Sequence, residues 1–135
     1  MRYVIDSYAW LEYFMGTSAG EKVREIIDST VHERLTPSIC VAEIYAKSLR
    51  VEGSEKAELR RSFIRVRSAV TALTEELAVE AAKIDVDLKK KVDGWGLADS
   101  IVLATTRKRK AKVITGDRHF KGLIETINIE SITYE

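Results

Sequence analysis

The sequence has a single cysteine and no long hydrophobic run, and each absence excludes a class of protein. Cys40 alone cannot form an intrachain disulfide or a cysteine-based metal cage, a usage that fits a reducing compartment. No apolar stretch approaches the length of a membrane span, and the N-terminus lacks a basic region followed by a long apolar run. We therefore expect a cytoplasmic protein without a membrane partner, in which Cys40 is a small buried hydrophobe.

Nucleotide-binding motifs and a strong net charge are also missing. Neither G-x-G-x-x-G nor a Walker lysine loop occurs, which disfavours dinucleotide and nucleoside-triphosphate binders. The 22 basic and 21 acidic side chains give a net charge of +1, so the molecule as a whole offers no electrostatic argument for nucleic acid. Its 135 residues, 45% hydrophobic and 32% charged, are typical of a globular protein that buries its own core. We expect one domain spanning residues 1–135.

Short β-favouring runs alternate with amphipathic helical segments along the chain. The runs are residues 3–5, 33–36, 70–73, 112–115 and 127–129. The first run shows no polar alternation, which is typical of a strand in a parallel sheet covered on both faces. With helical crossovers between the strands, the pattern predicts an α/β protein. We expect a three-layer α/β/α sandwich around a central, mainly parallel sheet of about five strands.

A helix start is predicted at Thr36-Pro37, with Thr36 as the N-cap and Pro37 at the first helical position. In that helix Glu43 shares a stripe with Ile39 and Ala46 at helical spacing. A carboxylate on such a largely apolar stripe needs a partner or a metal ion.

Three acids stand where strands end or a helix begins. Asp6 directly follows the first strand, Asp117 follows the fourth, and Asp99 lies in the first turn of a helix. Ligands of open α/β sheets bind beyond the carboxyl ends of the strands, where the strand order reverses. Helix capping is the competing explanation for Asp6, and the helix dipole is the competing explanation for Asp99. The residues alone leave these explanations open.

Together with Glu43, these three acids can meet at one rim of the sheet. Four neighbouring carboxylates raise one another's pKa unless cations neutralise them. Oxygen ligands of this kind suit Mg²⁺ or Mn²⁺ rather than zinc. A two-ion site activates water and stabilises the leaving oxygen in phosphodiester cleavage. The predicted chemistry is metal-assisted phosphoryl transfer.

Four motifs occur in a characteristic order and spacing: YVIDSYAWLEYF, TPSICVAEIYAK, GLADSIVLATTRKRK and KVITGDRHF. Together they resemble the PIN-domain family across nearly the whole chain, and the length is similar to that of the VapC-type toxins of toxin–antitoxin pairs. The resemblance implies an endoribonuclease in which Asp6 and Asp99 are the central Mg²⁺ or Mn²⁺ ligands, with Glu43 and Asp117 completing the acidic cluster. It also implies a small antitoxin that blocks this site, and a homodimer.

The resemblance extends to residues beside the acids. Ser7 and Thr115 match small hydroxyl positions next to the aspartates, and we expect them to orient the carboxylates. Tyr8 stands where many members of the family have a smaller residue, which would narrow the mouth of the site. His119 stands where some members have a further acid, which leaves open whether the site holds one metal ion or two.

Other residues that invite a chemical role are interpreted as structural. His32 and His119 are expected to be surface or loop residues, and we assign them no acid–base chemistry. Trp95 lies in a glycine-rich turn and is expected to pack over the core rather than stack on a base. Asp85 is interpreted as an ordinary surface charge.

The leading hypothesis is a metal-dependent ribonuclease in which an activated water attacks phosphorus in line and leaves a 5′-phosphate and a 3′-hydroxyl. The alternatives are a PIN-like nuclease that processes RNA outside a toxin–antitoxin pair, a receiver-like signalling domain phosphorylated on aspartate, and a non-catalytic binding module. The receiver pattern is disfavoured because Ser7, not a second acid, follows Asp6, and Glu130 rather than lysine follows the last predicted strand. A purely structural pocket has no evident reason to crowd four like charges.

Overall fold

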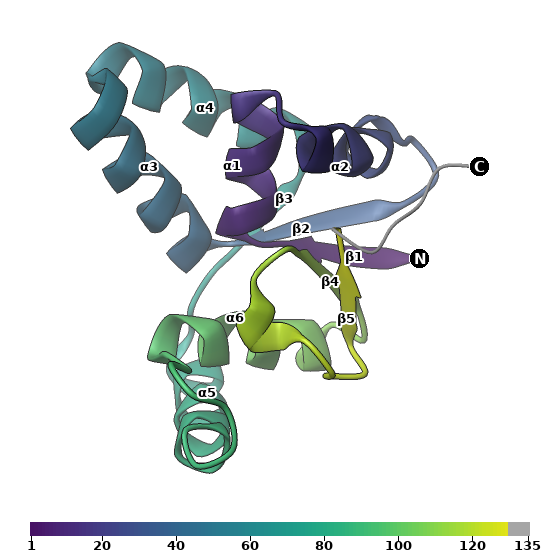
Figure 1. Cartoon of the computed structure of the whole chain (residues 1–135), viewed down its shortest axis with the longest axis vertical. Coiled ribbons are helices and arrows are strands. Elements are labelled where there is room, and N and C mark those ends of the chain that lie inside the picture. The colour runs from purple at the N-terminus through teal and green to yellow at the C-terminus, as the bar shows by residue number, and fades with distance from the viewer. Residues whose placement is uncertain (130–135) are drawn as a thin grey trace.

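Five parallel strands form one sheet with helices on both faces in the computed structural model, which describes residues 1–129 (Figure 1). The strands are β1 (Arg2–Ile5), β2 (Glu33–Pro37), β3 (Ala69–Thr71), β4 (Lys112–Thr115) and β5 (Thr126–Asn128). The α-helices are α1 (Ser7–Met15), α2 (Ser18–Asp28), α3 (Ser38–Glu52), α4 (Ser54–Arg67), α5 (Glu75–Leu88) and α6 (Leu97–Lys108), and a short 3₁₀ turn, η1, spans Arg118–Phe120. The predicted α/β sandwich with a five-stranded parallel sheet is confirmed.

The strand order β3-β2-β1-β4-β5 places β1 at the centre of the sheet. Val4 of β1 lies opposite Leu35 of β2 on one side and Val113 of β4 on the other. The chain builds the sheet outward from β1 to β3 and then returns to add β4 and β5. The strand order therefore reverses between β1 and β4, and ligand sites of open α/β sheets form beyond the carboxyl ends of strands at such a point.

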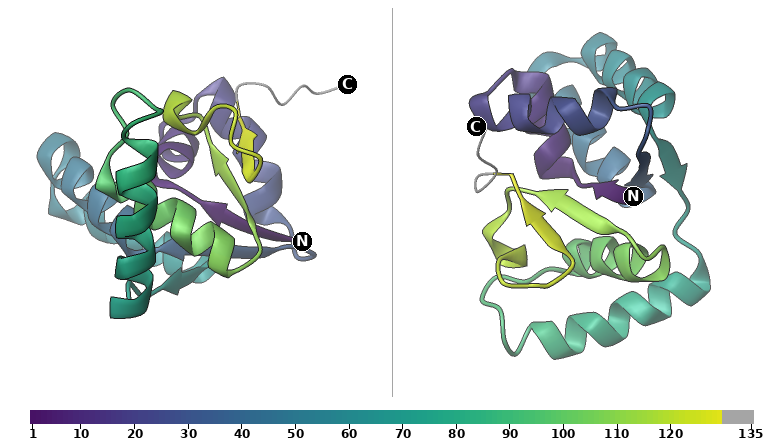
Figure 2. Two further views of the ribbon diagram at one scale, coloured as in Figure 1. Left: turned by 90° about the horizontal axis from the view of Figure 1, so that it is seen from below. Right: turned by 90° about the vertical axis from the view of Figure 1, so that its right-hand side faces the viewer.

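Helices α1 to α4 cover one face of the sheet, and α6 covers the other with α5 packed against it (Figure 2). Consecutive strand residues point to opposite faces, so each strand contributes to two cores. Val4 and Val113 pack with Leu103 of α6, whereas Ile5 and Ile114 pack with the helices of the opposite layer. Burial on both faces explains why the strands contain so little polar alternation. Cys40 is fully buried, as predicted.

The start of α3 differs from the prediction. Pro37 is the last residue of β2 and occupies the N-cap position, with an extended backbone at φ −60° and ψ 139°, so the helix begins at Ser38. Pro37 remains in the sheet because β2 continues to pair with β3, where it lies opposite Thr71. The Thr36 hydroxyl does not cap the helix, since it accepts a hydrogen bond from Trp10 Nε1 at 3.1 Å. The assignment of Thr36 as the N-cap was therefore wrong.

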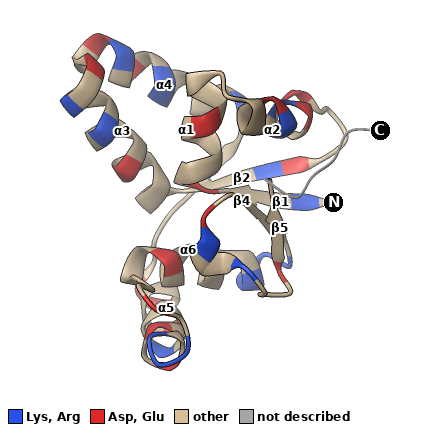
Figure 3. Ribbon diagram, in the orientation of Figure 1, with Lys and Arg blue, Asp and Glu red and all other residues tan. Residues whose placement is uncertain are grey.

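Acidic and basic residues alternate along the outer helices, and both signs occur on α2, α3, α4 and α5 (Figure 3). This distribution agrees with the near-zero net charge. Within residues 1–129, no helix has the length and apolar character needed to cross a membrane.

Candidate metal centre

Asp6 lies at the carboxyl end of the central strand and has two structural partners. It is the N-cap of α1, where its Oδ1 accepts a hydrogen bond from the backbone N–H of Ala9 at 3.0 Å. Its side chain also forms a hydrogen bond with the hydroxyl of Thr115, at the end of β4. Only 5% of Asp6 is exposed. The capping explanation is thus correct, and the same carboxylate also lies at the edge where the strand order reverses.

Glu43 approaches Asp6 from the middle of α3. The Ser7 hydroxyl, in the first turn of α1, donates a hydrogen bond to Glu43 Oε1 at 3.2 Å. The buried positions of α3 are Cys40, Ile44 and Ser48, so the stripe that Glu43 shares with Ile39 and Ala46 lies beside the buried face of the helix. The Glu43 carboxylate stands at the solvent-facing side of the acidic cluster, where Ser7 fixes its position.

Asp99 is held in the first turn of α6, as predicted, by the helix terminus itself. Its Oδ2 accepts a hydrogen bond from the backbone N–H of Gly96 at 2.9 Å. The next residue, Ser100, is anchored beneath it, accepting from Trp95 Nε1 at 2.7 Å and donating to Asp85 Oδ1 at 3.2 Å. These contacts fix the backbone that presents Asp99.

Two predictions about the residues around Asp99 have opposite outcomes. Trp95 is 4% exposed and packs in the core, so the core interpretation is confirmed. Asp85 is not an ordinary surface charge, because only 14% of its side chain is exposed and it receives both the Ser100 hydroxyl and Lys89 Nζ. The Ser100 contact comes from a separate helix, α6, and the residues around Asp85 in the sequence gave no indication of it.

Asp117 follows β4 after a single glycine. The backbone N–H of Asp117 donates to Thr115 Oγ1 at 2.9 Å, which turns the chain sharply at the strand end. Asp117 Oδ1 in turn accepts a hydrogen bond from the backbone N–H of His119 at 2.9 Å and so caps η1. Thr115 therefore contacts both Asp6 and Asp117, and its expected place beside the acids is observed.

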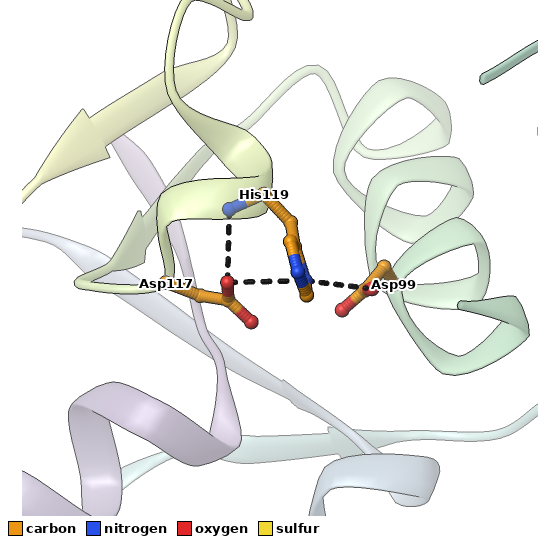
Figure 4. A group of neighbouring side chains, drawn as sticks. All are labelled: Asp99, Asp117 and His119. Atoms are coloured by element: carbon orange, nitrogen blue, oxygen red, sulfur yellow. Dashed lines mark hydrogen bonds and ion pairs between the residues drawn. The ribbon is translucent and has the colours of Figure 1, made fainter. Parts of the chain in front are cut away.

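His119 lies between Asp99 and Asp117 (Figure 4). Its Nδ1 is 3.2 Å from Asp117 Oδ1 and 3.6 Å from Asp99 Oδ2. His119 lies in the short turn η1 and is partly exposed, as expected of a loop residue, but its side chain also contacts two of the acids. The tight turn of η1 carries the side chain of residue 119 back over Asp117, and α6 supplies Asp99 from the other side. A histidine two residues after a strand-ending aspartate was the available sequence indication.

The pKa values of the acids record their proximity. Burial, and then the negative charges of Asp117 and Glu43, raise the pKa of Asp6 to about 7 against the hydrogen bonds from Thr115 and Ala9. Burial also raises the pKa of Glu43 and of Asp99, and the Asp117 charge adds to both shifts. The sequence-predicted acids therefore lie close enough to repel one another. Such a group is costly to keep ionised without a cation.

The donor set fits a divalent metal ion. One ligand atom each from Asp99, Asp117 and His119 lie within 4.8 Å of one another. Carboxylate oxygens are the ligands that Mg²⁺ and Mn²⁺ prefer, and a divalent ion would offset the burial and the repulsion that together raise the pKa of Asp6. Asp6 and Glu43 lie outside this group of three but near enough for their charges to interact with it.

The chain is similar in fold to solved toxin–antitoxin proteins. A toxin–antitoxin complex from Klebsiella pneumoniae matches with a TM-score of 0.75 at 15% identity, covering 96% of this chain and 99% of that chain. VapBC-1 from nontypeable Haemophilus influenzae matches with a TM-score of 0.75 at 17% identity, covering 97% of this chain and 100% of that chain. VapC20 from Mycobacterium tuberculosis, described as a sarcin–ricin loop cleaving toxin, matches with a TM-score of 0.72 at 19% identity, covering 91% of this chain and 97% of that chain.

At these identities the structural matches establish a shared fold. No curated protein sequence matches the chain. The model of the PIN domain matches residues 3–124, which include all the site residues described above. The chain therefore belongs to the PIN domain family.

Proposed function

We propose that this chain is a metal-dependent endoribonuclease and the toxin of a toxin–antitoxin pair. The observation that carries the proposal is the convergence of Asp6, Glu43, Asp99 and Asp117 at the point where the strand order reverses. Membership of the PIN domain family supports nuclease chemistry at this place in the fold.

The four acids are proposed to hold Mg²⁺ or Mn²⁺, with Asp6 and Asp99 as the central ligands. A divalent ion bound there supplies the charge that activates water and stabilises the leaving oxygen of a phosphodiester. Asp6 and Asp99 are presented by backbone N–H groups at helix N-termini, where a negative charge is stabilised. The carboxylates act as ligands and do not attack phosphorus themselves, so the expected products carry a 5′-phosphate and a 3′-hydroxyl.

Two hydroxyl groups are proposed to keep the acids in position. Ser7 donates to Glu43 and so orients this carboxylate of α3. Thr115 accepts from the backbone of Asp117, which leaves its O–H free to serve Asp6. Groups that hydrogen-bond to ligating carboxylates commonly tune metal affinity.

The toxin assignment draws on the structural neighbours. The matched structures from Klebsiella pneumoniae and Haemophilus influenzae are toxin–antitoxin assemblies, and VapC20 is described as cleaving the sarcin–ricin loop. By this analogy we propose RNA as the substrate, a cognate antitoxin as the protein partner, and a homodimer as the assembly. A PIN nuclease that processes RNA without an antitoxin is the alternative.

Cleavage of a panel of structured RNAs by the purified chain tests the proposal. We expect cutting with Mg²⁺ or Mn²⁺, none with a chelator, and 5′-phosphate ends on the downstream fragments. Products with a 2′,3′-cyclic phosphate would contradict the mechanism, because they report attack by the ribose hydroxyl. Inhibition of RNA cleavage by a small protein encoded by a neighbouring gene would support the assignment as a toxin. Cleavage that continues unchanged in the presence of that protein would favour the RNA-processing nuclease.

A further inference from the structure

We propose that His119 is a nitrogen ligand of the divalent ion held by Asp99 and Asp117, and that it makes this site prefer Mn²⁺ to Mg²⁺. The inference rests on the metal site of the proposed function. It concerns a residue that the acidic pattern of the sequence does not include.

The spacing of the three side chains suits ligands that share one ion. His119 Nδ1 lies 3.2 Å from Asp117 Oδ1 and 3.6 Å from Asp99 Oδ2. Two ligands in adjacent positions of an octahedron, each about 2.1 Å from the ion, are about 3 Å apart. The contacts drawn in Figure 4 are therefore close to the separations of neighbouring ligands.

The Nδ1 atom of His119 is buried and has no hydrogen-bond partner among residues 1–129. Both carboxylates lie within ion-pair distance of Nδ1, but neither contact meets the geometry of a hydrogen bond. A buried nitrogen without a partner is unfavourable, and a lone pair directed at two acids is what a metal ion satisfies.

The loop at Gly94 also confines the imidazole of His119, on the side of its Nε2 atom. Gly94 has φ +78°, and a Cβ atom at that position would lie 2.9 Å from His119 Nε2. The missing side chain at residue 94 gives the ring its space, while the His119 backbone N–H is bonded to Asp117 Oδ1. Because the ring is confined between this loop and the acids, Nδ1 is kept facing Asp99 and Asp117.

A nitrogen donor alters which ion the site favours. Mg²⁺ takes oxygen ligands almost exclusively and keeps several waters, whereas transition metals also accept imidazole. Two carboxylates and one imidazole therefore form a better site for Mn²⁺ than for Mg²⁺.

The opposing account is that His119 is a cation that merely pairs with the two acids. The two accounts predict opposite changes in Mn²⁺ affinity when His119 is replaced. A competing cation would have to be displaced by the metal, so its removal would tighten Mn²⁺ binding. Removal of a ligand weakens Mn²⁺ binding.

Electron spin-echo spectroscopy of Mn²⁺ bound to the purified full chain tests the inference without reference to catalysis. We expect ¹⁴N coupling from a ligated imidazole in the wild-type protein and its loss in His119→Gln. His32→Gln is the matched control, because His32 directly precedes β2 and packs against Tyr3 near the start of β1, away from the acids, so the ¹⁴N coupling of this variant should equal that of the wild type. Mn²⁺ bound without ¹⁴N coupling would overturn the inference and leave the proposed metal site intact.

Titration with Mn²⁺ and Mg²⁺ gives a second, independent result. His119→Gln should weaken Mn²⁺ binding by about tenfold or more, since loss even of an outer partner of a ligand costs that much, and should alter Mg²⁺ binding far less. His119→Asp should shift the preference toward Mg²⁺. Unchanged or tighter Mn²⁺ binding in His119→Gln would overturn the inference, whereas failure of the wild-type chain to bind either ion would overturn the proposed function with it.

Discussion

The hydroxyl of Thr115 forms a hydrogen bond with the carboxylate of Asp6 across the two central strands. Thr115 Oγ1 also accepts the backbone N–H of Asp117 at 2.9 Å, so one hydroxyl group connects two acids of the candidate metal centre. β1 and β4 are neighbours in the sheet but lie more than 100 residues apart in the sequence. Their pairing brings the two strand-ending motifs into one site.

Replacing Thr115 with valine should weaken metal binding while leaving the fold intact. Valine keeps the β-branched shape of this buried strand residue but cannot donate to Asp6 or accept from Asp117. We expect metal affinity to fall by about 10- to 100-fold, as for other partners of metal ligands. Calorimetric titration with Mn²⁺ measures this, and Thr115→Ser, which retains the hydroxyl, should recover most of the affinity. If Thr115→Val binds Mn²⁺ with the affinity of the wild type, the Thr115 hydroxyl does not contribute to metal binding.

Asp6 makes the stability of the metal-free protein depend on pH. Its pKa is raised from 3.8 to about 7, so between these values the unfolded chain releases a proton that the folded chain retains. The stabilisation from this group is complete below pH 4 and is lost as the pH rises through about 7. A shift of this size corresponds to a loss on the order of 4 kcal/mol.

Asp6→Asn should therefore stabilise the metal-free protein at pH 8 and have little effect near pH 4. Asparagine also caps helices well, so the N-terminus of α1 is preserved. Denaturant unfolding in the presence of a chelator measures the free energy at both pH values, and exposed Asp93→Asn is the matched control. If Asp6→Asn is instead less stable than the wild type at pH 8, groups within the protein itself stabilise the negative charge of Asp6.

Gly116 is required by its contact with Tyr8. A Cβ atom at residue 116 would lie 2.3 Å from Tyr8 Cε1 and 2.9 Å from Cδ1. Gly116→Ala should displace the Tyr8 ring and destabilise the protein by about 1–3 kcal/mol, the usual cost of overpacking. In a Tyr8→Ala background the same change should cost much less, and a double-mutant cycle measures the difference. If Gly116→Ala lowers stability equally in both backgrounds, the Tyr8 ring is not the cause of the destabilisation.

Arg60 connects α3 to α4 and should be important for stability. It is 7% exposed, donates to Ser48 Oγ and Glu52 Oε1 at 2.9 Å each, and lies over the Phe14 ring. Arg60→Ala leaves the buried Ser48 hydroxyl without its partner and removes the contact with the Phe14 ring, and it should cost about 1–3 kcal/mol. Neighbouring Arg61 forms an exposed pair with Glu58, so Arg61→Ala should cost less than about 1 kcal/mol. Thermal unfolding compares the two variants, and similar losses would contradict this account.

The fold and most of the acidic cluster could be predicted because they depend on local sequence. The strand that begins at Lys112 was predicted because a short β-branched run leads into a glycine and an aspartate, and it is observed over Lys112–Thr115. Asp6 was placed at a helix start, where aspartate is a good cap, and Asp99 in a first helical turn, where the helix dipole stabilises a negative charge. Parallel strands and their carboxyl ends then follow from the crossover rule.

The errors arose where tertiary contacts outweigh local preference. Thr36 is a good N-cap residue, but its hydroxyl is occupied by Trp10 and the strand continues through Pro37. The contact of His119 with Asp99 depends on how η1 and α6 pack together, and Asp85 is largely buried where it contacts Ser100. Separations of this kind are set by packing of the complete sheet and its helices, which no single segment encodes.

Metal-dependent RNA cleavage by Asp99→Asn, set beside Asp93→Asn, tests the central claim most directly. Asp99 receives the Gly96 N–H and borders the acidic group, whereas Asp93 is exposed in the preceding loop. We expect Asp93→Asn to cut RNA like the wild type with Mg²⁺ or Mn²⁺, and Asp99→Asn to lose at least about 100-fold in rate while keeping its fold by circular dichroism. Equal cleavage by the two variants would contradict the assignment of the acidic cluster as the catalytic site.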